Sequence, residues 1–165
     1  MREVVDEVGP DAARFFFLMR KADSHLDFDL DLAKKQSSEN PVFYVQYAHA
    51  RICSVFRQAE KEGVFRPAAR EARLECLTAP EEQEAVKLVA RFPDVVEEAT
   101  RELEPHRIVF FLIDTAGAFH RFYNRHRILG SESELCTARL YLCAAVQRVL
   151  RNGLNLLGVR APESM

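Results

Sequence analysis

The residues that follow Asn40 repeat their apolar side chains at helical spacing, and this repeat limits the fold more than any other feature of the chain. Pro41 suits the first turn of a helix, where its missing N–H costs nothing. The apolar positions share one side of a helix wound at about 100° per residue: Val42, Val45, Ile52, Phe56 and Ala59. The sequence therefore predicts a helix from about residue 41 to 62 that buries this side and is ended by Gly63.

A second stripe on the same helix is rotated away from the apolar one. It consists of Tyr44, Tyr47, Arg51 and Gln58. Such an aromatic, polar and cationic surface suits a ligand with flat faces and negative charge. The alternative is that the tyrosines are half-buried structural residues with solvated hydroxyls, and the pattern alone leaves both interpretations open.

Apolar repeats and capping signals predict further helices. Thr78 with Glu81, and Ser131 with Glu134, have the spacing of a capping box. We expect helices at 2–8, from Pro10, from Thr78 to Arg91, from Pro93, from Pro105 to Gly130, and from Ser131 to about Leu157. The helix after Pro105 carries the longest apolar repeat, so it is expected at the centre of the bundle.

Two segments lack a helical repeat. Between residues 26 and 32, leucine and phenylalanine alternate with aspartate, which predicts a short extended piece. Residues 64–77 mix charge with alanine and proline and are expected to form a loop or loosely helical connector. The chain is therefore predicted to be all-α, with an antiparallel helical bundle at 41–165 and a short N-terminal helical connector at 1–40.

Positive charge is concentrated in the last third of the chain. Although the net charge is −2, the stretch from Thr115 to Pro162 holds seven Arg and two Glu. This asymmetry indicates an anionic partner for the basic part. Arginine can grip a phosphate through two hydrogen bonds and stack on a base. A solvated helix face would have a similar composition, and charge counting does not separate the two.

Several classes of protein are disfavoured. The longest apolar run, Ile108 to Ile113, is too short to span a membrane, and the charged N-terminal residues do not resemble a signal peptide. The four cysteines form no C-x-x-C pair, which favours reduced thiols in a cytoplasmic protein. The sequence has neither a glycine-rich phosphate loop nor histidines at metal-binding spacing, so we expect no catalytic residue and no metal site.

Several segments resemble the C-terminal region of bacterial arginyl-tRNA synthetases. The stretch from Asn40 to Arg51 resembles the signature helix of their anticodon-binding domain, and Asp11 to Arg14 resembles its Asp-Ala-Leu-Arg motif, with Ala13 in place of leucine. Further matches are Ser24 to Ala33, Ala118 to Asn124, and Asn152 to Val159. The resemblance covers the whole chain. It implies that residues 1–40 follow the catalytic domain and that residues 41–165 form the anticodon-binding bundle.

The resemblance also implies a binding site for the anticodon loop. The positions that match the family's RNA contacts are Tyr44 and Tyr123, which would stack on bases, with Ala48 packed beside Tyr44 and Met165 reaching the same loop. Arg127 stands where some relatives carry an aromatic residue. Arg121, Asn124 and Arg125 lie in the same segment and complete the expected site, whereas Gln46 and Tyr47 are expected to be structural.

Parent enzymes of this family are class I synthetases that use ATP with magnesium to join arginine to tRNA-Arg. Their His-x-Gly-His and Lys-Met-Ser-Lys motifs do not occur here. The resemblance therefore implies a non-catalytic fragment without a cofactor of its own. It would be a monomer that binds no membrane, with tRNA-Arg and the missing catalytic domain as partners. The main competing interpretation is a helical protein–protein interaction module without RNA binding; a metal or small-molecule bundle would need inward-facing ligands, and the core stripes offer only Asp114.

Overall fold

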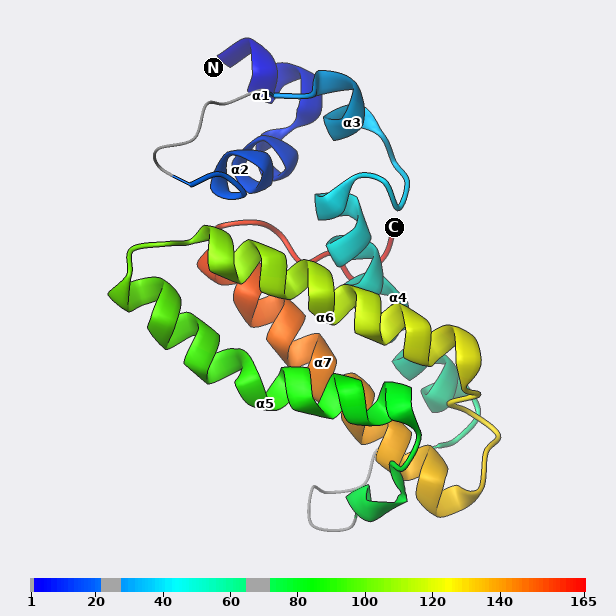
Figure 1. Ribbon diagram of the computed structural model, residues 1–165. Coiled ribbons are helices and arrows are strands. Elements are labelled where there is room, and N and C mark those ends of the chain that lie inside the picture. Colours follow the sequence, from blue (N-terminus) through cyan, green and yellow to red (C-terminus); the bar gives the residue numbers. More distant parts are fainter. Residues whose placement is uncertain (1, 22–27, 65–71) are drawn as a thin grey trace.

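The computed structural model describes residues 2–21, 28–64 and 72–165 (Figure 1). These residues form seven α-helices and one short 3-10 helix: α1 (Arg2–Val8), α2 (Pro10–Leu18), α3 (Leu30–Lys34), α4 (Pro41–Lys61), η2 (Leu74–Cys76), α5 (Pro80–Arg101), α6 (His106–Arg125) and α7 (Ser133–Leu156). The described ranges contain no strand. The predicted all-α fold is therefore confirmed.

Four long helices make up the bundle, and α1 to α3 lie together at one end of it (Figure 1). α5 and α6 run in opposite directions, as do α6 and α7, whereas α4 runs alongside α6 in the same direction. The C-terminus returns to the beginning of α4. In the ranges that the structure describes, no helix has the length and apolar character needed to cross a membrane.

Helix α6 is the centre of the bundle, as its apolar repeat predicts. It packs against α4, α5 and α7, and its N-terminal part also meets α2. Leu112, Ala116 and Phe119 are wholly buried. Burying such side chains removes apolar surface from water, which is the main favourable contribution to folding.

Helix α2 shares the core of the bundle. Phe15 is wholly buried and belongs to the same hydrophobic cluster as Val45 of α4 and Phe119 of α6. The N-terminal helices are therefore fastened to the bundle through side-chain packing. The division of the chain at residue 40 stays a prediction.

The expected helix start at Pro93 is wrong, because α5 continues through this residue to Arg101. A proline inside a helix removes one hydrogen bond and costs about 3 kcal/mol. Packing of the residues before and after Pro93 in the sequence offsets that cost. The Phe92 ring stacks on Phe111 of α6 at 5.9 Å between centroids, and Val95 and Ala99 are buried. Tertiary contacts here outweigh local propensity.

The predicted helix ends differ from the observed ones by a few residues. α5 is capped at Ala79, whose N–H donates to the Glu82 carboxylate at 2.9 Å, so the box expected at Thr78 and Glu81 is displaced by one position. α7 begins at Ser133 without a side-chain cap, not at Ser131. α6 ends at Arg125, before Gly130. Pro80, which suits a first helical turn, explains the first displacement.

The extended piece expected near residue 30 is also wrong in its described part. Leu30–Lys34 forms the short helix α3, capped by the Asp29 carboxylate, which accepts from the Leu32 N–H at 2.9 Å. The aspartates that suggested alternation include this N-cap. Residues 26 and 27 lie outside the described ranges, as do 65–71 of the expected 64–77 connector, whose later part contains η2.

Two glycines should respond to alanine in opposite ways. A Cβ at Gly153 would lie 2.5 Å from Cδ2 of the wholly buried Leu112, whereas a Cβ at Gly117 would lie 3.3 Å from the tip of the exposed Arg121. Overpacking costs about 1–3 kcal/mol, but alanine in a helix gains up to about 1 kcal/mol over glycine. We expect Gly153→Ala to lower the melting temperature and Gly117→Ala to leave it unchanged or raise it. A Gly153→Ala protein as stable as the parent would contradict the close packing of α6 and α7.

Candidate functional site

A row of stacked side chains begins on α4. Phe43 and Tyr47 are one helical turn apart, and their rings lie almost parallel, at 9°, with 6.1 Å between centroids. Both are half-buried, because the adjacent apolar stripe of α4 faces the core. Their spacing of four residues places them one above the other on the helix surface.

The guanidinium of Arg51 continues this row to α6. It lies over the Tyr47 ring at 5.1 Å and over the Tyr123 ring at 4.6 Å. We refer to Phe43, Tyr47, Arg51 and Tyr123 as the stacking row. Among the described residues, Arg51 forms no ion pair with a carboxylate, so its charge is balanced only by the aromatic faces around it. Such a cation is suited to an external anion or a base.

His120 supports the row from α6. Its ring lies 5.8 Å from Tyr47 and 4.6 Å from Tyr44, and its Nε2 donates to the Tyr44 carbonyl at 3.5 Å. Burial lowers the pKa of His120, and nearby Arg51 lowers it further against the opposing effect of the carbonyl. The imidazole is therefore neutral at physiological pH and acts here as an aromatic ring that joins α4 to α6.

The expected stacking residues border separate cavities. Tyr123 lines a cavity of about 440 Å³ with Arg51, Ser54, Gln58 and Arg127. Tyr44 lines another of about 470 Å³ in the groove between α5 and α6. His120 and Tyr47 lie between the two tyrosines, so these rings do not face one common pocket.

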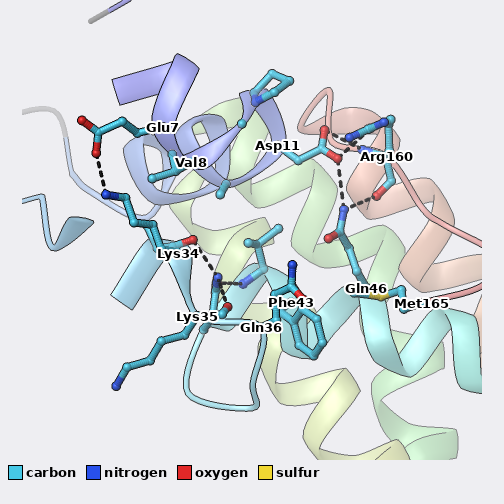
Figure 2. A pocket seen from close by; sticks show the side chains of 16 residues that line it. Glu7, Val8, Asp11, Lys34, Lys35, Gln36, Phe43, Gln46, Arg160 and Met165 are labelled. Atoms are coloured by element: carbon cyan, nitrogen blue, oxygen red, sulfur yellow. Dashed lines mark hydrogen bonds and ion pairs between the residues drawn. The ribbon is translucent and has the colours of Figure 1, made fainter. Parts of the chain in front are cut away.

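The remaining predicted residues differ in accessibility. Ala48 is wholly buried, whereas Asn124 and Arg127 are exposed. The Arg127 Nε donates to the Leu129 carbonyl at 3.0 Å, which keeps the side chain beside the turn after α6. Met165 is 54% exposed and lines a cavity of about 660 Å³ together with Phe43, the first member of the stacking row (Figure 2).

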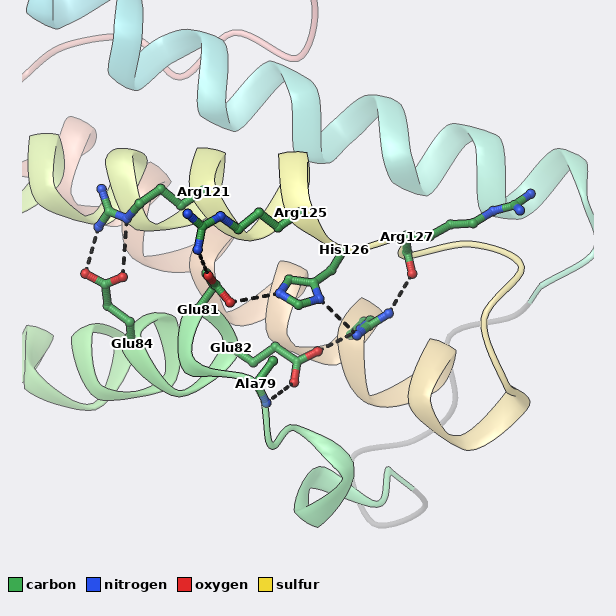
Figure 3. Close-up of polar contacts among 9 residues, drawn as sticks. Ala79, Glu81, Glu82, Glu84, Arg121, Arg125, His126 and Arg127 are labelled. Atoms are coloured by element: carbon green, nitrogen blue, oxygen red, sulfur yellow. Dashed lines mark hydrogen bonds and ion pairs between the residues drawn. The ribbon is translucent and has the colours of Figure 1, made fainter.

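The basic segment offers fewer free charges than its composition suggests. Arg121 pairs with Glu84 at 2.7 Å, and Arg125 pairs with Glu81 (Figure 3). Arg139 and Arg160 are likewise paired, with Glu82 and Asp11. Within the described residues, the arginines of this segment that form no ion pair are Arg127, Arg148 and Arg151. The sequence count therefore overstated the positive surface.

A polar network fixes the turn that follows α6. The buried Glu82 accepts from Arg139 Nε at 2.7 Å, and Arg139 in turn donates to the Arg127 carbonyl at 2.8 Å and to His126 Nδ1 at 3.4 Å. Because arginine can only donate, His126 accepts at Nδ1 and donates from Nε2 to Glu81 at 2.9 Å (Figure 3). The network ties the α6 end to α5 and α7 and so holds Arg127 at the cavity beside Tyr123.

The comparison with known families decides the class of this chain. Residues 45–165 match the family described as the DALR anticodon binding domain. The chain belongs to this family. The match begins inside α4, at residue 45, runs through α7, and therefore includes the stacking row from Tyr47 onward.

Relatives of this DALR domain are larger proteins. The chain is 57% identical over its full length to an arginine–tRNA ligase from Syntrophotalea carbinolica, and 56% identical to one from Geobacter metallireducens. It spans 30% and 29% of their lengths. The Thermus thermophilus arginyl-tRNA synthetase superposes with a TM-score of 0.81 at 31% identity, over 96% of this chain and 27% of the other.

Three residues of the DALR domain's row, Phe43, Tyr47 and Arg51, were not among those predicted to bind. Tyr47 was expected to be structural, and Arg51 was noticed in the second stripe of α4 but not assigned a role. The signal was the spacing of residues 43, 47 and 51, which puts two aromatic rings and a guanidinium on one line along the helix. His120 gave no such signal, because its contact with Tyr44 depends on how α4 and α6 pack.

The network should make the stability of the DALR domain sensitive to acid. Hydrogen bonds from His126, its own backbone N–H and Arg125 lower the pKa of Glu81 from 4.5 to about 2. A carboxylate with a lowered folded-state pKa stabilises the fold above its unfolded pKa and loses this effect as the pH falls toward the folded value. The melting temperature of the parent should therefore fall more between pH 4.5 and 2 than that of Glu81→Gln. Equal losses in the two proteins would contradict the role given to Glu81.

Proposed function

We propose that this chain binds the anticodon loop of tRNA-Arg as the RNA-reading part of an arginine–tRNA ligase. The family match and the names of the relatives support the class of partner. The observation that carries the proposal is the guanidinium of Arg51 held between the rings of Tyr47 and Tyr123 beside an open cavity. Unpaired loop bases are bound by aromatic faces and arginine planes.

In this proposal the stacking row receives the flat faces of loop bases. Tyr123, Arg51 and the adjacent cavity form one position, where Ser54, Gln58 and Arg127 supply polar groups for base edges or phosphate. Tyr44 and Arg121 form a second position in the groove between α5 and α6. Met165 and Phe43 extend the surface at its other end. Asn124 and Arg125 lie on the exposed rim of α6, and buried Ala48 contributes by its small size, which lets α4 approach its neighbours.

The parent enzyme would join arginine to tRNA-Arg with ATP and magnesium, through a catalytic domain outside this chain. Among the described residues, no group of three or more His, Cys, Asp or Glu side chains could hold a metal ion. We assign this chain no catalytic step, because the His-x-Gly-His and Lys-Met-Ser-Lys motifs of the parent enzymes do not occur in its sequence. The proposal includes a monomeric cytoplasmic enzyme; the free, buried thiols of Cys53, Cys136 and Cys143 suit a reducing compartment.

Substitutions in the row and at Tyr44 test the base-stacking role. We expect Tyr44→Ala, Arg51→Ala and Tyr123→Ala each to weaken binding of a tRNA-Arg anticodon hairpin by about 1–3 kcal/mol, the usual contribution of stacking on one base. Tyr123→Phe should keep most of the affinity, because the ring supplies the stacking. Arg51→Lys should not, because lysine keeps the charge but loses the planar group. Affinities can be measured by fluorescence anisotropy.

The control for these variants is Tyr141→Ala. Tyr141 is a half-buried tyrosine of α7 that lines an apolar groove with Leu74 and Val86, away from the row. Its loss should lower stability without changing the affinity of the folded protein for the hairpin. If Tyr141→Ala weakens binding as much as Tyr123→Ala at equal folded fraction, the row is not the site.

The ion pairs of the basic segment predict a shallow dependence of binding on salt. Arg51, Arg127, Arg148 and Arg151 are without carboxylate partners among the described residues. Each phosphate contact to single-stranded RNA contributes about −0.7 to the slope of log K against log salt concentration. Not all four of these arginines lie near the row, so we expect about three phosphate contacts and therefore a slope of roughly −2. A flat response would contradict RNA binding through this surface and would favour a protein–protein module.

A further inference from the structure

The segment that follows α7 runs back along one face of α4 and is held there by hydrogen bonds to its carbonyl groups. Gln46 donates to the Arg160 carbonyl at 2.9 Å, and Arg57 donates to the Glu163 carbonyl at 3.0 Å. The buried His49 donates from Nδ1 to the Pro162 carbonyl at 2.8 Å, since a carbonyl can only accept. We refer to residues 157–165 as the C-terminal tail.

Helix α2 holds the same tail through two residues of the Asp-Ala-Leu-Arg-like motif. The Asp11 carboxylate accepts from the Arg160 side chain at 2.8 Å and from the Arg160 backbone N–H at 3.3 Å (Figure 2). It also accepts from the Gln46 side chain at 3.2 Å, which links it to α4. Arg14, one turn further along α2, donates to the Gly158 carbonyl.

Gly158 is adapted to this contact. Its φ of +66° lies in the left-handed region that favours glycine, and a Cβ there would lie 2.8 Å from the Arg14 guanidinium. Glycine therefore leaves α7 at this position without backbone strain and leaves room for the Arg14 guanidinium. Both the aspartate and the arginine of the motif are committed to the tail.

The tail carries Met165 to the stacking row. A chain end normally frays, but here the hydrogen bonds at Arg160, Pro162 and Glu163 fix the path of the backbone. Met165 thereby lies at the cavity that Phe43 also lines (Figure 2). It is 54% exposed, so it presents apolar surface to the outside and not to the core.

We propose that Asp11 and Arg14 are positioning residues that form a clasp on the C-terminal tail, so that Met165 is presented beside Phe43 for contact with RNA. This proposal rests on the proposed function. The clasp joins α2, which belongs to the helical connector, to the tail that carries Met165 to the RNA-facing surface. The Arg160 side chain is 81% exposed, whereas that of Asp11 is 16% exposed. Because one partner of the ion pair is in solvent, removing Arg160 should free the tail without unfolding the chain.

Release of the tail can be measured without RNA. We expect carboxypeptidase Y to remove Met165 and Ser164 several-fold faster from Asp11→Ala than from the full parent chain, as followed by mass spectrometry. Arg160→Ala, which leaves α2 intact, should do the same, and the exchange Asp11→Arg with Arg160→Asp should slow digestion again.

The matched control is Glu7→Ala. Glu7 pairs with Lys34 at 2.6 Å in the wall of the same cavity. Among the described residues its ion-pair partner is Lys34 and not a residue of the tail, so its loss should leave digestion at the parent rate. The clasp is overturned if Asp11→Ala and Arg160→Ala are digested at the parent rate, or if Glu7→Ala is digested as fast as they are.

Hairpin binding then tests what the clasp does for RNA. Asp11→Ala and Met165→Ala should each weaken binding, and the double variant should be no worse than Met165→Ala alone, because both changes remove the same contact. Fully additive losses would overturn the positioning role. If the parent chain binds no hairpin, the proposed function fails, while the digestion rates still decide whether the clasp exists.

Discussion

Packing of α6 on several sides is the constraint on which the rest of the structure depends. The helix meets α4, α5 and α7 along its length, so only a narrow strip of it stays accessible. The close approach of Gly153 to Leu112 brings α7 against one side, and the Phe92–Phe111 contact brings α5 against another. Near its C-terminal end, α6 turns Arg121 and Arg125 toward glutamates of α5 and turns Tyr123 toward Arg51 of α4.

The stacking row follows from this arrangement. Because α4 and α6 run in the same direction, Tyr44 lies level with His120, and Arg51 lies level with Tyr123. The guanidinium bridges the two helices without a carboxylate among the described residues, whereas the neighbouring Arg121 and Arg125 are held by glutamates of α5. One cation thus stays available between aromatic rings while the surrounding charges stabilise the bundle.

Features that depend on a single helix were predictable from the sequence. Asn40 with Pro41 marked the start of α4, the end of α7 was expected near Leu157 and lies at Leu156, and the apolar repeat identified α6 as the centre. Motif resemblance supplied the family. Features that depend on contacts between helices were not predictable. α5 continues through the exposed Pro93 because its neighbours Phe92 and Val95 pack against Phe111 of α6. Arg139, which was counted toward the basic part of the chain, is buried against Glu82.

The proposed binding residues divide in the same way, into those whose place was predictable from one helix and those whose place depends on contacts between helices. Tyr123 and Arg127 border one cavity, as their closeness in sequence indicated. Tyr44 faces the groove between α5 and α6, because packing of α4 against α6 fixes the direction in which its side chain points. Arg51 lies between a ring of α4 and a ring of α6, so its role could not be assigned from the pattern of one helix alone.

We propose that this surface reads unpaired bases of one tRNA loop. The most direct measurement compares the affinity of the chain for two hairpins with the same stem, one carrying the tRNA-Arg anticodon loop and the other an unrelated loop, at equal salt. We expect clearly tighter binding of the arginine hairpin. Equal binding of both hairpins, or equal binding of the stem as a duplex without a loop, would contradict it.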